Sequence, residues 1–283
     1  MNPKTQVARL SVLSNSVLIL MKVAAGIISG SVSILSEAIH SSMDLVAALI
    51  AFFAVKISDT PSDDKHNYGH AKVENVSGVV EGLLILVAAG WIIFEAIRKL
   101  KHPVPVEALG IGSIVMLLSA IINTLVSRRL YNTARKTHSV ALEADALHLK
   151  TDVLTSLGVA VGLLLIWITD IHWLDPVIAI LVALLILRES FVLIRKAFFP
   201  LLDVAWDSDE LKHLNSIFER LQVNQHSVKT RKAGNHRFID LHIELPPDME
   251  FKTVHDFCSA IENEISKEFE NVQVTIHPEP YDH

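Results

Sequence analysis

Six long apolar runs set the strongest limit on how this chain can fold. A run of about 20 apolar residues is long enough to cross the hydrocarbon core of a bilayer as a helix. The runs are Leu10 to Ile28, Ser31 to Val55, Ser77 to Ile97, Leu109 to Val126, Ala141 to Ile168 and Leu174 to Ile194. With 51% hydrophobic residues and a mean hydropathy of +0.40, the chain is also too apolar for an ordinary soluble domain. We therefore expect residues 1–202 to form an α-helical domain with six transmembrane helices.

The pattern changes from residue 203 onward, where the sequence becomes typical of a soluble domain. Two segments have the periodicity of amphipathic helices, and three segments alternate as strands. The helices are Asp207 to Arg220 and Lys252 to Phe269, and the strands lie around Val228, at Ile239 to Leu245 and at Val272 to Ile276. The order α-β-β-α-β predicts a small sheet with helices on one face. Residues 203–283 are thus expected to form a separate, ferredoxin-like α+β domain.

The distribution of positive charge predicts the orientation of the chain. Six spans place both termini on one side of the membrane, and most of the Lys and Arg residues outside the runs fall on that side. Arg98, Lys99 and Lys101 lie on the opposite side, but the majority places both termini in the cytoplasm. The first run lacks the short apolar region and cleavage site of a signal peptide, so we interpret it as a retained helix.

The sequence lacks the features of a disulfide-bonded protein and of a nucleic-acid-binding protein. The single cysteine, Cys258, cannot form an internal disulfide bond. No long run of Lys and Arg marks a surface that binds nucleic acid. We therefore expect no nucleic-acid partner.

One short motif, an acid followed by Ala, Ile or Leu, His and, four residues later, Asp, occurs twice inside apolar runs. The two copies are SEAIHSSMD at residues 36–44 and ADALHLKTD at residues 144–152. Residues four apart share a face of a helix, so His40 lies beside Asp44, and His148 beside Asp152. A charged residue inside a bilayer costs at least a few kcal/mol unless it is paired or serves water or an ion. Two imidazoles and two carboxylates from two helices are a ligand set that a tetrahedral Zn²⁺ accepts.

A simpler interpretation exists for each of these residues. A single His or Asp in a membrane helix is often only a hydrogen-bond partner of a neighbouring helix, but two matching pairs favour a metal site. Glu37 and Asp145 lie on the same two stripes, where they either guide ions or sit in an aqueous cavity. Lys150 lies off the stripe and is not assigned to the site.

Two further groups of residues carry ligand chemistry. In the loop after the second run, Asp63, His66 and His70 form either an ordinary solvated loop or a second metal site. In the C-terminal segment, the alternation of the strands points His242 and His277 away from the expected core. That outer face is either solvated surface or a metal-dependent contact.

Taken together, the two His-x-x-x-Asp helices, the six runs, the loop DDKHNYGHAKVE and the α/β tail resemble the cation diffusion facilitator family, in particular its short bacterial zinc-transporting members. The resemblance covers essentially the whole chain. It implies three metal sites: His40, Asp44, His148 and Asp152 for transport, Asp63, His66 and His70 in the loop, and His226, His242, His255, His277 and Glu279 in the cytoplasmic domain. Glu279 stands where relatives often have Asp, which leaves the geometry of that site open.

The resemblance also implies an activity and partners. It implies a homodimer in the bacterial cytoplasmic (inner) membrane, embedded in the lipid bilayer, which exports a divalent cation while protons move inward. Zn²⁺ is the expected substrate and structural ligand, with protons as the counter-ion; Fe²⁺, Cd²⁺, Co²⁺ and Mn²⁺ are the alternative metals.

Two alternative functions for the same residues are a membrane metalloenzyme and a metal sensor without transport. Catalytic zinc usually keeps three protein ligands and one open position, whereas the two helices offer four ligands. The motif His-Glu-x-x-His is also absent. We therefore expect a transporter and no enzyme activity.

Overall fold

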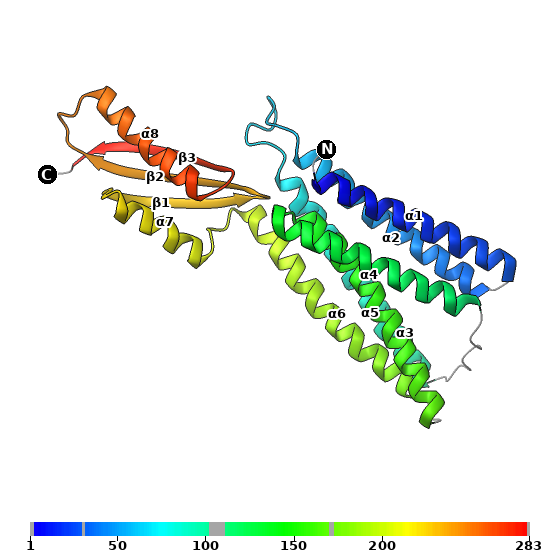
Figure 1. Ribbon diagram of the computed structural model, residues 1–283. Helices are drawn as coiled ribbons and strands as arrows, with labels where there is room; N and C mark the ends of the chain where they lie inside the picture. The colour runs from blue at the N-terminus through cyan, green and yellow to red at the C-terminus, as the bar shows by residue number, and fades with distance from the viewer. Residues whose placement is uncertain (1–2, 30–31, 102–110, 170–172, 282–283) are drawn as a thin grey trace. The chain divides into compact units, whose positions relative to one another are not determined.

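Six long helices make up the first of two units in the computed structural model, which describes residues 3–29, 32–101, 111–169 and 173–281 (Figure 1). The first unit is Met1–Phe198 and the second is Phe199–His283. The helices of the first unit are α1 (Pro3–Ser29), α2 (Val32–Ser58), α3 (Lys72–Lys101), α4 (Ile111–Thr137), α5 (Val140–Thr169) and α6 (Leu174–Phe198). Each of the six apolar runs of the sequence falls largely within one of these helices.

Among the described residues, three segments are long and apolar enough, by length and composition, to cross a membrane: Pro3–Ala25, Lys72–Arg98 and Pro176–Leu202. Helix α5 carries four charged residues in its first half, Glu143, Asp145, Lys150 and Asp152. Asp152 belongs to the candidate site described below.

Helices α3 and α6 approach each other closely at a glycine. A Cβ atom added to Gly82 of α3 would lie 2.5 Å from Cγ1 of Ile194 of α6, which is closer than real Cβ atoms come to their neighbours. The backbone oxygen of Gly82 also accepts a 2.6 Å hydrogen bond from the hydroxyl group of Ser190. Small residues allow membrane helices to pack at short range, and here glycine lets the two backbones meet.

A buried carboxylate connects several helices on the side of the unit where α2 ends and α3 begins. Glu74 of α3 accepts 2.8 Å hydrogen bonds from Lys4 of α1 and Ser58 of α2. Ser139, just before α5, donates to the other carboxylate oxygen of Glu74. Lys4 also forms a 2.8 Å ion pair with Asp59. One side chain therefore holds the ends of α1, α2, α3 and α5 together.

The second unit is an α/β domain whose order of elements agrees with the predicted order. A short 3-10 helix η1 (Phe199–Leu202) leads into α7 (Ser208–Arg220), β1 (Gln225–Ala233), β2 (His236–Leu245), α8 (Phe251–Glu268) and β3 (Val272–Pro280). The sheet has the order β1-β2-β3, with β1 antiparallel and β3 parallel to β2. Figure 1 shows this sheet together with its two helices.

The core of the second unit lies on one face of the sheet. Ile239, Leu241 and Ile243 of β2 are buried against Ile217 of α7 and Ile261 of α8. Because successive side chains of a strand point to opposite faces, the residues between them lie on the face that the helices leave uncovered. His242 is one of these residues.

An ion-pair cluster fastens α7 to the sheet. Glu210 of α7 contacts Lys232 of β1, and Arg237 of β2 donates a 3.1 Å hydrogen bond to its Oε1. Partial burial by itself raises the pKa of the Glu210 carboxyl, but the hydrogen bonds from Lys232 and Arg237 outweigh it and lower this pKa below its ordinary value. Glu210 therefore stabilises the folded domain in its ionised form.

We expect the stability of residues 199–283 to fall as acid protonates Glu210. Because the folded-state pKa is lowered, the contribution is fully present above the pKa of the unfolded chain and is lost as pH falls through the folded-state pKa, in the range of about pH 5 to 3. Glu210→Gln should cost about 1 kcal/mol at pH 7 and flatten this pH dependence. Urea unfolding at several pH values measures both effects. Glu219→Gln, on the same helix and exposed, is the control; equal pH profiles for the two variants would contradict the assignment.

Candidate functional site

Residues of the repeated motif come together inside the helical unit. Asp44 of α2 lies opposite His148 and Asp152 of α5, and one ligand atom from each residue lies within 4.8 Å of the others. The ring nitrogen Nε2 of His148 is 3.2 Å from Oδ1 of Asp44, and the two side chains are only 13% and 8% exposed. Spacing of four residues on α5 places His148 and Asp152 on one face, as expected. The structure thus brings three predicted ligands together.

The fourth predicted ligand of this group is His40. The backbone of α2 is helical there, so His40 stands one turn before Asp44. The side chains of His40 and Glu37 lie outside the described residues. The role of His40 therefore stays a prediction.

Polar residues of α1 lie close to this part of α2. The amide of Asn15 donates a 3.4 Å hydrogen bond to the backbone oxygen of Asp44. The ammonium group of Lys22 donates a 2.6 Å hydrogen bond to the hydroxyl group of Ser41. All four residues are buried. The sequence shows Asn15 and Lys22 as polar positions in an apolar run, but only the packing of α1 against α2 shows what they contact.

Two further carboxylates are fully buried in the helical unit. Asp145 precedes His148 by one turn of α5, and neither of its oxygens has a hydrogen-bond partner among the described residues. Glu81 of α3 accepts a 2.8 Å hydrogen bond from Ser77. Asp145 therefore does not lie in an open aqueous cavity, which was one of its two expected settings. Sequence reasoning missed Glu81, although an acid in the middle of an apolar run was a visible signal.

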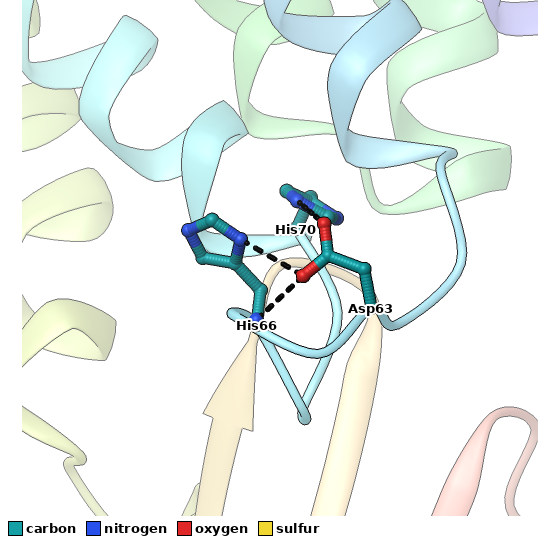
Figure 2. A group of neighbouring side chains, drawn as sticks. All are labelled: Asp63, His66 and His70. Atoms are coloured by element: carbon teal, nitrogen blue, oxygen red, sulfur yellow. Dashed lines mark hydrogen bonds and ion pairs between the residues drawn. The ribbon is translucent and has the colours of Figure 1, made fainter.

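The predicted loop residues also form a cluster, shown in Figure 2. Oδ1 of Asp63 accepts hydrogen bonds from the backbone N–H groups of His66, at 2.6 Å, and Lys65, at 2.9 Å. The rings of His66 and His70 lie 4.4 Å apart, and Nε2 of His70 is 3.5 Å from Oδ2 of Asp63. Gly69 has a φ of +80°, a conformation that favours glycine, and turns the chain back toward Asp63.

The same hydrogen bonds favour the ionised form of Asp63. The backbone N–H of His66 is the largest cause, and together with Lys65 it lowers the pKa of the Asp63 carboxyl below its ordinary value. A metal at this loop would therefore meet no competing proton on the carboxylate at neutral pH. The ligand atoms of Asp63, His66 and His70 lie within 4.8 Å of one another.

A third cluster occupies the uncovered face of the sheet. His226 of β1 pairs with His242 of β2, which in turn pairs with His277 of β3. Glu279 lies two residues beyond His277 and so points to the same face. Its carboxylate is 2.8 Å from Nδ1 of His242, 3.2 Å from Nε2 of His226 and 3.5 Å from Nε2 of His277. The register of the three strands therefore gathers three imidazoles around one carboxylate.

This arrangement bears on two residues of the predicted cytoplasmic site, Glu279 and His255. Although Glu279 stands where relatives often have Asp, its longer side chain still reaches the histidines. The hydrogen bond from His242 is the largest cause of a lowered pKa at Glu279. His255 lies on α8, which packs on the opposite face of the sheet. Within one chain, His255 therefore lies apart from the other four predicted ligands, and its role as a ligand stays a prediction.

The three clusters have the same chemistry. Each joins at least one imidazole to at least one carboxylate, and both groups are ligands for Zn²⁺ and other divalent metals of the first transition row. The clusters differ in setting, because the first is buried among helices and the other two are partly exposed. A buried site of this kind, between two long helices, can bind a cation that enters it from the water on either side of a membrane.

Comparison with known proteins covers both units. The model of the cation efflux transmembrane domain matches residues 8–202, and that of the cation efflux protein cytoplasmic domain matches residues 207–281. An uncharacterized transporter of Synechocystis is 36% identical over 263 residues, which cover 92% of this chain and 85% of that protein. The cation-efflux pump FieF of Yersinia pestis is 31% identical over 270 residues, 94% of this chain and 89% of that protein.

A solved structure of a C-terminal domain matches part of the chain. The metal-bound C-terminal domain of the CzcD transporter from Thermotoga maritima is 32% identical, with a TM-score of 0.25, and the match covers 26% of this chain and 94% of that one.

The two family models divide the chain into a membrane domain followed by a cytoplasmic domain that contains the sheet. They confirm the expected class of function, which is the efflux of divalent metal cations by a membrane protein, and exclude the metalloenzyme alternative at the level of the family. The chain belongs to the cation efflux family, also called the cation diffusion facilitator family, along almost its whole length.

Proposed function

We propose that this protein exports Zn²⁺ across the bacterial inner membrane in exchange for protons. The transport site consists of His40, Asp44, His148 and Asp152. The observation that carries the proposal is the convergence of Asp44, His148 and Asp152 from two helices, with their ligand atoms within 4.8 Å. A divalent cation at this point compensates carboxylates that are otherwise costly inside a membrane.

The choice of zinc rests on the composition of the ligand set. Two imidazoles and two carboxylates suit a tetrahedral, borderline metal, whereas harder ions such as Mn²⁺ prefer more oxygen ligands. Fe²⁺, Co²⁺ and Cd²⁺ are the competing substrates. His40 is the ligand that adds the second nitrogen.

The membrane topology belongs to the same proposal. All six helices cross the membrane, both termini are cytoplasmic, and residues 1–202 form the transport domain. Residues 203–283 form the metal-binding, dimerising domain. Support comes from three helices apolar enough to span a membrane, and from the Lys and Arg residues concentrated on one side.

Proton exchange follows from competition for the same atoms. His148 binds a metal only through a nitrogen that carries no proton, and a carboxylate likewise binds best when ionised. Bound zinc and bound protons therefore exclude each other at this site. If the site opens to each side of the membrane in turn, zinc leaves as protons enter.

Zinc flux in vesicles containing the purified protein tests the proposed function. We expect zinc uptake to be several-fold faster into vesicles with an acidic interior than into vesicles without a pH gradient, because protons leave as zinc enters. A fluorescent zinc indicator inside the vesicles measures the rate. Equal rates under both conditions would contradict proton exchange, and no flux above that of protein-free vesicles would contradict transport of zinc. Parallel assays with Fe²⁺, Co²⁺, Cd²⁺ and Mn²⁺ rank the substrates.

Asp152→Ala should lower zinc flux by at least about tenfold, because it removes a ligand from the transport site. The protein should still fold, since the change removes a ligand group and no apolar side chain. Glu95→Ala on α3 is a matched control, because Glu95 is a helix carboxylate outside the three clusters and forms a 3.8 Å ion pair with Arg98. Normal flux in a folded Asp152→Ala protein would exclude the site.

The loop cluster is proposed as a second zinc site. Asp63→Asn keeps an oxygen that can accept the hydrogen bonds from the loop backbone but removes the negative charge. We therefore expect about tenfold weaker zinc binding with little change in the loop. Asp64→Asn changes the charge of the loop equally but lies outside the cluster. Calorimetric zinc titration of the full chain compares the two variants, and an equal effect of both would mean that only the net charge of the loop matters.

The sheet cluster is proposed to bind zinc and to promote a homodimer through the cytoplasmic domain. We expect zinc to shift residues 199–283 from monomer to dimer at micromolar concentration. His242→Ala should abolish this shift, because His242 lies at the centre of the cluster. His236→Ala, on the same strand and outside the cluster, should retain it. Sedimentation velocity with and without zinc decides; a fragment that stays monomeric in both conditions contradicts the proposal for this domain.

A further inference from the structure

A cavity of about 540 Å³ lies between α4, α5 and α6, away from the three metal clusters. Its charged lining residues are Arg128 of α4, Glu143 and Lys150 of α5, and Glu189 and Lys196 of α6. On α5, the cavity faces the stripe that contains Glu143 and Lys150. This stripe lies on the opposite side of the helix from His148 and Asp152, since neighbouring positions on a helix are about 100° apart.

The charges of the cavity do not balance. Lys196 forms an ion pair with Glu143, and Glu189 contacts its neighbour Arg188 at 3.6 Å. Arg128 and Lys150, in contrast, have no hydrogen-bond or ion-pair partner among the residues that the structure describes. Two positive charges in the lining are therefore left without a counter-charge, so the cavity favours an anion.

The two unpaired cations lie at the same level of the helical unit. At 1.5 Å per residue, Arg128 is about 14 Å from the end of α4 and Lys150 is about 15 Å from the start of α5. The end of α4 and the start of α5 are on the same side of the unit, because a short turn joins them. Tyr131 and Asn132, one turn from Arg128, add a hydroxyl group and an amide to the lining at this level.

The faces that lead from the cavity toward the middle of the helical unit are apolar and exposed. Leu125 precedes Arg128 by three residues and is 61% exposed. Leu157 follows Lys150 by two helical turns and is 58% exposed, and Leu185, one turn from Glu189, is 45% exposed. Residues at these spacings share a face with the charged lining residues. An anionic group in the cavity would therefore continue into an apolar surface.

We propose that the cavity binds the head group of an anionic phospholipid. Arg128 and Lys150 hold the phosphate, Tyr131 and Asn132 donate hydrogen bonds to it, and the acyl chains lie along Leu125, Leu157 and Leu185. The apolar surface distinguishes a lipid from a free phosphate ion, which shares the head-group chemistry but gains nothing from exposed leucines. This site is independent of the identity of the transported metal.

The test uses the full-length protein, purified in mild detergent and titrated with phosphatidylglycerol or, separately, with phosphatidylcholine. Native mass spectrometry measures the affinity for each lipid. We expect the wild type to prefer phosphatidylglycerol. Arg128→Gln and Lys150→Gln should each weaken its binding about fivefold, and the double variant about thirtyfold. Phosphatidylcholine binding should hardly change.

Matched variants keep the test independent of folding. Arg129→Gln removes an exposed cation from the neighbouring position of α4, outside the cavity lining, and should bind phosphatidylglycerol as the wild type does. Lys150→Arg keeps the charge and should retain the preference even if Lys150→Gln unfolds.

Three results would overturn the proposal. The first is a folded double variant with the phosphatidylglycerol affinity of the wild type, and the second is equal binding of both lipids by the wild type. In the third, millimolar inorganic phosphate displaces phosphatidylglycerol, which would make the cavity a site for a free anion.

Discussion

The burial of carboxylates among apolar helices is the constraint on which the arrangement of the helical unit depends. Each such group must meet a cation, a hydrogen-bond donor or a proton, because an isolated charge is costly in a membrane. Glu74 meets Lys4, and Asp44 meets His148. These contacts join different helices, so they determine which helices lie side by side. The polar positions of α1 have the same explanation, since they contact α2 and α3 rather than lipid.

The three clusters share a second property: in each of them a carboxylate contacts at least one imidazole. Asp44 contacts His148, Asp63 contacts His66, and Glu279 contacts three histidines. Such contacts hold ligand atoms near the positions that a metal requires and reduce the ordering that binding would cost.

Local periodicity predicted the parts of the fold and site that depend on one element at a time. Helical spacing placed His148 beside Asp152, and strand alternation placed His242 on the uncovered face. Contacts between distant segments could not be predicted, since they depend on how the helices rotate and pack. The burial of Glu81 and the hydrogen bonds that Glu74 accepts from other helices are of this kind. The assignment of His255 came from the resemblance alone and stays a prediction; α8 packs on the core face of the sheet, so within one chain His255 lies apart from the other histidines.

The close approach at Gly82 has a consequence for how sequences of this kind vary. Any side chain at residue 82 enters the space of Ile194, whose own backbone nitrogen is only 3.6 Å from the added Cβ. The two helices must then separate, or residue 194 must become smaller. Among homologous sequences, glycine at position 82 should therefore occur with a large aliphatic residue at position 194. Alanine or serine at position 82 should occur with a small residue at position 194. The pair would evolve as a unit, independently of the metal that the protein carries.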